Sequence, residues 1–255
     1  MSLKRTQRTW DALGSEDAMW AILTVPGKRG GKWDAEEFFA WGRDEIRALL
    51  DDLDALGVGI GRRHALDFGC GIGRLTRALA DHFEEVDGVD IAPSMIRLAE
   101  ELNSDVKGCR FHLNATADLG LFPDDRFDLV YSNITLQHIE PSFIRSYLGE
   151  FVRVARPGGA VVFQLPTGRA APREETGGTL KRTLRRAAPA RTLGWYRTAR
   201  RALPTKRHVI EMHALPEAEV RALLDVHGAR LVEARPDSWA TGWRGLRYFA
   251  VVTAR

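Results

Sequence analysis

The sequence predicts an α/β fold in which a mostly parallel β-sheet carries helices on both faces. Three observations indicate this class. Short apolar runs alternate with amphipathic runs of helical period along most of the chain. Glycines at positions 69, 71 and 73 separate the first such pair of runs. The length of 255 residues allows one full core with additional segments at its edges.

The first strand–helix unit surrounds the glycine turn. Ala65–Phe68 is short and apolar, which predicts a buried strand. After the turn, apolar residues repeat at helical spacing: Ile72, Leu75, Leu79 and Phe83. Glycine permits a sharp bend and lets a ligand approach the backbone with no Cβ in the way.

Later units repeat this pattern. Glu85–Ile91 predicts a second strand, and Pro93 opens the next helix at a position where its missing N–H costs little. Further strands are predicted at Cys109–Leu113, Phe127–Ser132, Ala160–Leu165, Arg230–Ala234 and Tyr248–Thr253, and helices at Pro141–Ala155 and Pro216–His227.

Two segments fall outside the alternating pattern. Residues 1–58 hold six of the 22 aromatic residues and predict a helical, aromatic cap, with a helix that starts at Asp34 and runs toward Leu56. The second segment is an insertion at residues 167–210. Thr167–Arg207 carries 12 Lys or Arg and two acidic residues, a net charge of +10 in a chain of net charge +3. We expect a basic helical lid here, and a surface that binds an anionic partner is the alternative.

Acidic side chains beside the turn indicate the kind of ligand. A dinucleotide-binding turn would have glycine at position 74, where this chain has Arg74. The carboxylate of Asp67 would repel a pyrophosphate but suits a ligand with an ammonium group. Asp90, at the end of the second strand, can accept hydrogen bonds from both ribose hydroxyls of an adenosine. These residues favour S-adenosylmethionine over NAD.

Over residues 60–166 the chain resembles the class I S-adenosylmethionine-dependent methyltransferases. The motifs that carry the resemblance are Asp67-x-Gly69-x-Gly71-x-Gly73, Asp90, Asn114–Leu119, Phe127–Ser132, Leu136–Ile139 and Arg156–Gly159. The resemblance implies a Rossmann-like sheet of seven strands with the last one antiparallel, and a methyltransferase domain at residues 59–255. It also implies a set of cofactor-binding residues: Asp67, Gly69, Cys70, Gly71, Asp90, Ile91, Met95, Ala117, Asp118 and Asn133.

The segment directly after the fourth predicted strand indicates the kind of methyl acceptor. Ser132–Thr135 lacks the Pro-Pro-aromatic motif of enzymes that methylate adenine or amide nitrogens, which makes nucleic acid a poor acceptor. A neutral hydroxyl needs a general base, and His138 is the first candidate because an unperturbed imidazole titrates near neutral pH. His213 and Glu211 are the second candidates. A structural role for each of these residues is the alternative.

We therefore expect an S-adenosylmethionine-dependent O-methyltransferase that acts on a small or oligomeric acceptor. The segment Glu211–His213 and the terminal strand resemble methyltransferases of glycan and natural-product assembly, which favours a sugar hydroxyl or a natural product. The alternatives are N-methylation of a small amine, or a nucleic-acid-binding module that retains the cofactor fold.

Composition agrees with a cytoplasmic enzyme. Two cysteines, Cys70 and Cys109, form no disulfide framework, Met1–Gln7 lacks the apolar run of a signal peptide, and no run is long enough to span a membrane. No Asp/His cluster has metal-ligand spacing, although scattered ligands would be compatible with a divalent ion.

Overall fold

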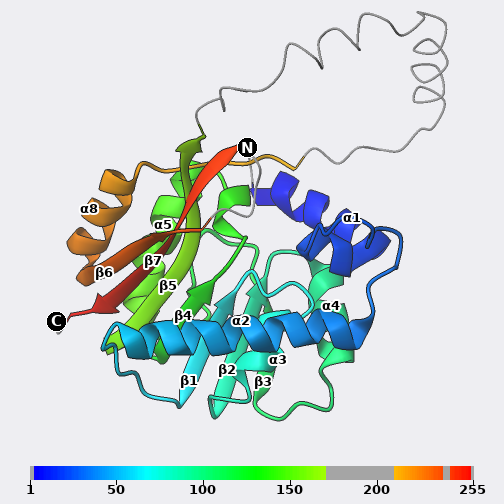
Figure 1. The fold of residues 1–255 in the computed structure, drawn as a ribbon, viewed down its shortest axis with the longest axis horizontal. Helices are drawn as coiled ribbons and strands as arrows, with labels where there is room; N and C mark the ends of the chain where they lie inside the picture. The colour runs from blue at the N-terminus through cyan, green and yellow to red at the C-terminus, as the bar shows by residue number, and fades with distance from the viewer. Residues whose placement is uncertain (1–2, 171–209, 238–241, 254–255) are drawn as a thin grey trace, which may run out of the picture. The chain divides into compact units, whose positions relative to one another are not determined.

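The computed structural model describes residues 3–170, 210–237 and 242–253, and within them the chain forms a seven-stranded sheet (Figure 1). The strands are β1 (His64–Phe68), β2 (Glu85–Asp90), β3 (Cys109–Leu113), β4 (Phe127–Ser132), β5 (Ala155–Arg169), β6 (Ala229–Pro236) and β7 (Trp243–Val252). Their order in the sheet is β3-β2-β1-β4-β5-β7-β6. Pairing is parallel from β3 to β5, and β7 runs antiparallel to both of its neighbours. This confirms the predicted mostly parallel sheet.

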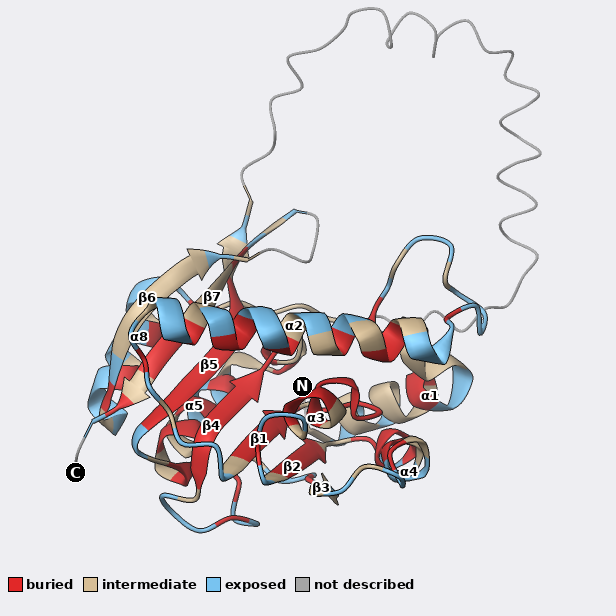
Figure 2. Cartoon of the chain, turned by 60° about the horizontal axis from the view of Figure 1, so that its bottom comes forward, coloured by how far each residue is buried: buried red, intermediate tan, exposed pale blue. Residues whose placement is uncertain are grey.

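The helices lie on both faces, as the alternation predicted. Side chains of α2 (Ala35–Ala55) and α3 (Arg74–Leu79) share a core cluster with β1 and β4, whereas α5 (Pro141–Val154) and α8 (Glu217–His227) pack into a second cluster. Strands covered on both faces are buried along their whole length, and all six residues of β4 are buried (Figure 2). Two more helices, α1 (Leu3–Ile22) and α4 (Pro93–Leu102), contact each other in a third cluster.

Helix α2 begins where the sequence predicted. The carboxylate of Asp34 accepts a hydrogen bond from the backbone N–H of Glu37 at 2.9 Å, which is the geometry of an N-terminal cap. The buried residues of α2 include Ile46, Leu49 and Leu53, and they pack against the sheet. The predicted cap of residues 1–58 therefore shares its core with the rest of the domain.

Several boundaries differ from the sequence prediction. Helix α3 ends at Leu79, so Phe83 lies beyond it, although its side chain is still buried in the same core cluster. Strand β5 begins at Ala155 and contains the expected turn as an irregularity, where Gly158 has a φ of 78° and the register with β4 shifts. Strand β7 begins at Trp243 because its pairing with β5 extends past the buried stretch.

Of the predicted basic insertion at residues 167–210, the structure describes only residues 167–170 and 210. Residues 171–209, which make up most of it, lie outside the described part of the chain. Within the described ranges, no helix combines the length and the apolar character needed to cross a membrane.

Candidate functional site

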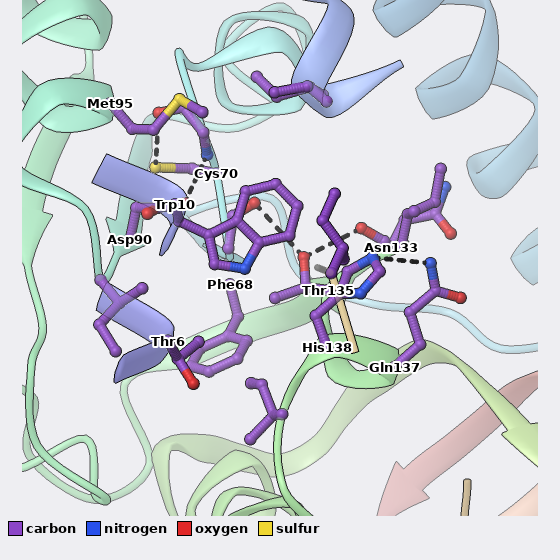
Figure 3. Close-up of a pocket in the computed structure, with 18 of the residues that line it drawn as sticks. Thr6, Trp10, Phe68, Cys70, Asp90, Met95, Asn133, Thr135, Gln137 and His138 are labelled. Carbon is purple, nitrogen blue, oxygen red and sulfur yellow. Dashed lines mark hydrogen bonds between the residues drawn. The ribbon is translucent and has the colours of Figure 1, made fainter. Parts of the chain in front are cut away.

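A cavity of about 630 Å³ opens at the carboxyl ends of β1, β2 and β4 (Figure 3). The strand order reverses between β1 and β4, and in open α/β sheets ligands bind at this switch point. The walls come from the glycine turn after β1, the end of β2, the segment after β4, and α1. In Figure 3, Asp90, Cys70 and Met95 lie at one end, and His138, Gln137 and Asn133 lie at the other.

The glycine turn is closely packed by protein as well as open to the cavity. Gly69 and Gly71 have φ of 78° and 54°, in the left-handed region that favours glycine. A Cβ on Gly69 would meet the Thr135 side chain at 2.2 Å, and one on Gly71 would meet Ile22 at 2.5 Å. Both glycines and Cys70 line the cavity. Close packing against Thr135 and Ile22 is thus a second reason for glycine, besides room for a ligand.

Asp90 is held by the backbone at the edge of the cavity. One carboxylate oxygen accepts from the N–H of Gly71 at 3.0 Å, and the other accepts from the N–H of Ala92 at 2.8 Å. Burial raises the pKa of the carboxyl above its usual range, against these hydrogen bonds. Each oxygen keeps a lone pair that can accept a ligand hydroxyl. Ile91 and Met95 line the cavity beside it, so three predicted cofactor residues lie together.

Asp67 lies beneath the cavity and does not line it. Its side chain is 1% exposed and accepts a hydrogen bond from the Thr76 hydroxyl at 2.7 Å. Burial raises the pKa of Asp67 to about 7. The carboxyl group therefore connects the end of β1 to α3 directly behind the turn.

The predicted cofactor-binding residues Ala117 and Asp118 are not among the residues that line the cavity. Asp118 is exposed, and its carboxylate accepts from the Thr116 hydroxyl at 3.0 Å and from the Gly120 N–H at 3.1 Å. Asn114 lines the cavity in their place and donates from its amide to the Asp118 carbonyl at 2.9 Å. The sequence reasoning missed Asn114, although a polar residue directly after β3 was a usable signal.

Asn133 belongs to a buried polar cluster that the sequence reasoning also missed. Its amide donates to Glu45 Oε1 at 2.6 Å, and the Tyr131 hydroxyl donates to the same oxygen at 2.8 Å. Arg74 Nη2 pairs with Glu45 Oε2 at 2.9 Å. Glu45 stands on the buried stripe of α2, in step with Gly42 and Leu49, and a charged residue at such a position was the available signal.

His138 is a neutral imidazole in a crowded setting. Its Nδ1 lies 3.1 Å from the carbonyl oxygen of Glu211, and its Nε2 lies 3.0 Å from the amide nitrogen of Gln137. A carbonyl can only accept, so Nδ1 carries the proton and Nε2 accepts from the amide. Burial lowers the pKa of His138 to about 4, below the ordinary value assumed from the sequence. The ring lies 5.1 Å from that of Trp10.

The other two candidate bases lie beside His138, and neither lines the cavity. The Glu211 carboxylate pairs with Arg5 at 3.3 Å and lies 3.8 Å from His213 Nε2. The backbone N–H of His213 donates to the Gln137 carbonyl at 2.7 Å. Their neighbours Ile210 and Met212 form cavity wall instead. The described residues contain no group of three or more His, Cys, Asp or Glu that could hold a metal ion.

Comparison with known proteins locates the similarity in the same region. Residues 66–163 match the model of a methyltransferase domain. The chain is 31% identical over 156 residues to a 2-methyl-6-phytyl-1,4-hydroquinone methyltransferase of Synechocystis, covering 60% of this chain and 47% of that one. It is 36% identical over 125 residues to a malonyl-[acyl-carrier protein] O-methyltransferase of Halorhodospira halophila, covering 48% and 40%. The match thus spans less than half the length of these relatives.

Solved structures with the same fold match over nearly the whole chain. A magnesium protoporphyrin IX methyltransferase of Synechocystis with bound SAM has a TM-score of 0.61 at 17% identity, covering 98% of this chain and 97% of that one. A DhpI–SAH complex has a TM-score of 0.58 at 17% identity, covering 99% and 98%. At this identity the likeness concerns the fold.

Proposed function

Residues 66–163 are a methyltransferase domain in a class I fold, and on that premise we propose that the chain is an S-adenosylmethionine-dependent O-methyltransferase acting on a small hydroxyl-bearing acceptor. The observation that carries the proposal is one cavity lined by both Asp90 and His138. An acid suited to a ribose lies at one end, and a neutral imidazole lies at the other.

The cofactor would be held by residues that already line the cavity. Asp90 would accept hydrogen bonds from the ribose hydroxyls. Ile91, Met95 and Asn114, which also line the cavity, would surround the adenine. The amino-acid end would pass over the turn at Gly69 and Gly71, where no Cβ intervenes. When bound, the cofactor supplies an electrophilic methyl group on a sulfonium.

His138 would then manage the proton of the acceptor hydroxyl. The bound cofactor would supply its methyl carbon to the acceptor oxygen, and its sulfur would keep the electron pair of the broken carbon–sulfur bond. His138 Nε2 takes the hydroxyl proton, provided that the acceptor displaces the Gln137 amide from it. The Glu211 carbonyl fixes the ring by accepting from Nδ1. Orientation and exclusion of water supply the rest of the acceleration.

The walls near His138 favour an acceptor with an apolar body. They include Trp10, Ile139, Ile210 and Met212. A sugar would leave hydroxyls without partners against these side chains, whereas an aromatic or aliphatic natural product would not. Of the two acceptor classes expected from the sequence, we therefore favour a natural-product hydroxyl. The nucleic-acid alternative depended on the insertion, most of which lies outside the described residues.

The test is methyl transfer from labelled S-adenosylmethionine to fractionated metabolites, read with wild-type, His138→Ala and the control His82→Ala. His82 is exposed and does not line the cavity. We expect a labelled, base-stable ether in an apolar fraction, with only His138→Ala impaired. Label in an amine, at equal rates in all three proteins, would favour the N-methylation alternative.

A further inference from the structure

Arg74 lies beside the glycine turn, and the proposed function gives it no role. It occupies the first position of α3, directly after the glycine turn, and its side chain is 4% exposed. A guanidinium is costly to bury without a partner. Arg74 also lines the cavity, as does Asn133, which is 7% exposed and comes directly after β4.

Glu45 of α2 joins these two side chains. Its Oε2 pairs with Arg74, and its Oε1 accepts from Asn133 and Tyr131. The carboxylate is thus shared among three donors, one from α3, one from β4 and one from the residue directly after β4. The Glu45 side chain is 11% exposed and is not among the residues that line the cavity. It therefore stands behind the cavity wall and orients the side chains that form it.

Each of the two oriented side chains keeps one polar atom without a partner. Among the described residues that line the cavity, three have a buried side-chain atom that makes no hydrogen bond: Arg74 Nε, Asn133 Oδ1 and Gln137 Oε1. Arg74 and Asn133 are the two that Glu45 orients. Arg74 Nε can only donate and Asn133 Oδ1 can only accept. Buried polar groups are normally paired, so this pair indicates a ligand that brings an acceptor and a donor.

An α-amino acid has that combination, since its carboxylate only accepts and its ammonium only donates. The amino-acid end of S-adenosylmethionine would pass over Gly69 and Gly71, next to Arg74. In Figure 3, Asp90 lies at the opposite end of the cavity from Asn133. Arg74 Nε and Asn133 Oδ1 therefore lie where we expect the zwitterionic amino-acid end of the cofactor.

We propose that Arg74 binds the carboxylate of the cofactor's amino-acid end, that Asn133 Oδ1 binds its ammonium, and that Glu45 is the positioning residue for both. The proposal rests on the proposed function. It gives α2, which belongs to the predicted cap of residues 1–58, a role in positioning two cofactor-binding side chains. The competing explanation is that Arg74 and Glu45 only hold α2 against α3, whose backbones meet closely at Gly42.

Two ligands separate these explanations. S-adenosylhomocysteine carries the amino-acid end, and 5′-methylthioadenosine keeps the adenosine and the thioether without it. In calorimetric titrations, Arg74→Gln should lower the affinity for S-adenosylhomocysteine by about 10- to 100-fold, as expected for the loss of a charge-assisted contact. The affinity for 5′-methylthioadenosine should stay within about 2-fold of the wild-type value. The ratio of the two affinities does not depend on the fraction of folded protein.

Three controls sharpen the test. Arg77→Gln alters the same helix at a residue that pairs with Asp105 outside the cavity, and should change neither affinity. The double variant Glu45→Gln/Arg74→Gln removes both buried charges together, so it should fold even if Arg74→Gln does not, and it should show the same selective loss. Decarboxylated S-adenosylhomocysteine keeps the ammonium but not the carboxylate. Asn133→Ala should therefore lower the affinity for this ligand, and Arg74→Gln should not.

The outcomes are distinct. Equal loss of both ligands in Arg74→Gln and in the double variant, or no loss of either, overturns the assignment of Arg74 and supports the purely structural explanation. Wild-type protein that binds neither ligand overturns the proposed function, and this inference with it. Selective loss of S-adenosylhomocysteine supports the inference.

Discussion

Asp11 of α1 caps the N-terminus of α4, because its carboxylate accepts a hydrogen bond from the backbone N–H of Ser94 at 2.8 Å. The Ser94 hydroxyl donates in return to the Asp11 carbonyl at 2.8 Å. Helix α4 has no capping side chain of its own, since its N-cap is Ala92. Gln7 adds a hydrogen bond to the Ile91 carbonyl at 3.0 Å. Helix α1 is therefore tied to the elements that line the adenosine end of the cavity.

We expect Asp11→Ala to destabilise the protein by about 0.5–2 kcal/mol, the usual cost of losing an N-cap. Because the cap holds α1 against Ile91 and Met95, affinity for S-adenosylhomocysteine should fall as well. Urea denaturation and calorimetric titration measure the two effects. Asp11→Asn keeps an acceptor at the same place and should lose much less. If Asp11→Ala and Asp11→Asn behaved alike, the carboxylate would not act as a cap.

Asp67→Asn should change how stability depends on pH. Folding raises the pKa of Asp67 from 3.8 to about 7, so between these values the folded protein holds a proton that the unfolded chain has lost. The wild type should therefore lose stability as pH rises through this window, by up to about 1.4 kcal/mol per unit from this group. Asparagine does not titrate and can still accept from Thr76.

The measurement is the free energy of unfolding of both proteins from pH 4.5 to 8. The advantage of Asp67→Asn should grow up to about pH 7 and then level off. Asp105→Asn is the control, because the hydrogen bond from Arg77 lowers the pKa of Asp105, and it stays ionised across this window. A constant difference between wild type and Asp67→Asn would show that Asp67 is ionised throughout.

The strands around the site could be predicted because their signals are local. The apolar run before the glycine turn and the acid that ends β2 are each readable within a few residues, and both lie where expected. The start of β7 was missed because Trp243–Arg247 contains two arginines and a glycine and shows no regular alternation of apolar and polar residues. There, pairing with β5 maintains the strand, and local pattern does not.

The buried cluster at Glu45 could not be predicted in the same way. Its hydrogen bond to Asn133 joins residues 88 positions apart, and its bond to Tyr131 spans 86. Periodicity indicates which face of a helix is buried, but it does not indicate which distant side chain meets that face. Burial lowers the pKa of His138, and local sequence does not show how deeply the ring is buried. The Glu211 carbonyl that fixes its tautomer lies 73 residues away, and its hydrogen bond opposes this lowering.

Asp90→Ala should make the binding free energy of S-adenosylhomocysteine less favourable by about 1.5–3 kcal/mol, because hydrogen bonds to a charged group are lost. It should also release the N–H groups of Gly71 and Ala92, so the turn itself will loosen. Calorimetric titration gives the affinity, and thermal denaturation reports the second effect. Unlike Arg74→Gln, this variant should lose 5′-methylthioadenosine as well, because that ligand keeps the ribose. Unchanged affinity for both ligands would remove Asp90 from the site.

His138→Ala should lower kcat by about 10²–10⁴-fold and leave affinity for S-adenosylhomocysteine nearly unchanged, since general-base catalysis acts on the acceptor proton. Burial lowers the pKa of His138 to about 4, and the imidazole is competent above that value. The acidic limb of kcat/KM should therefore lie near pH 4, with no fall attributable to this group near pH 6.5.

A variant of Gln137 provides a second test of His138, in which NMR titration measures the pKa of the His138 ring. The amide N–H of Gln137 bonds to the Nε2 lone pair, which stabilises the neutral imidazole. Gln137→Leu should remove that preference and raise the pKa of His138, moving the acidic limb to higher pH in step.

If the limb of the wild type lay near 6.5 and vanished in His138→Ala, the imidazole would be solvated during turnover. If His138→Ala kept near-normal kcat on the true acceptor, His138 would only support Trp10 and the Glu211 segment, and the acceptor would be one that needs no base.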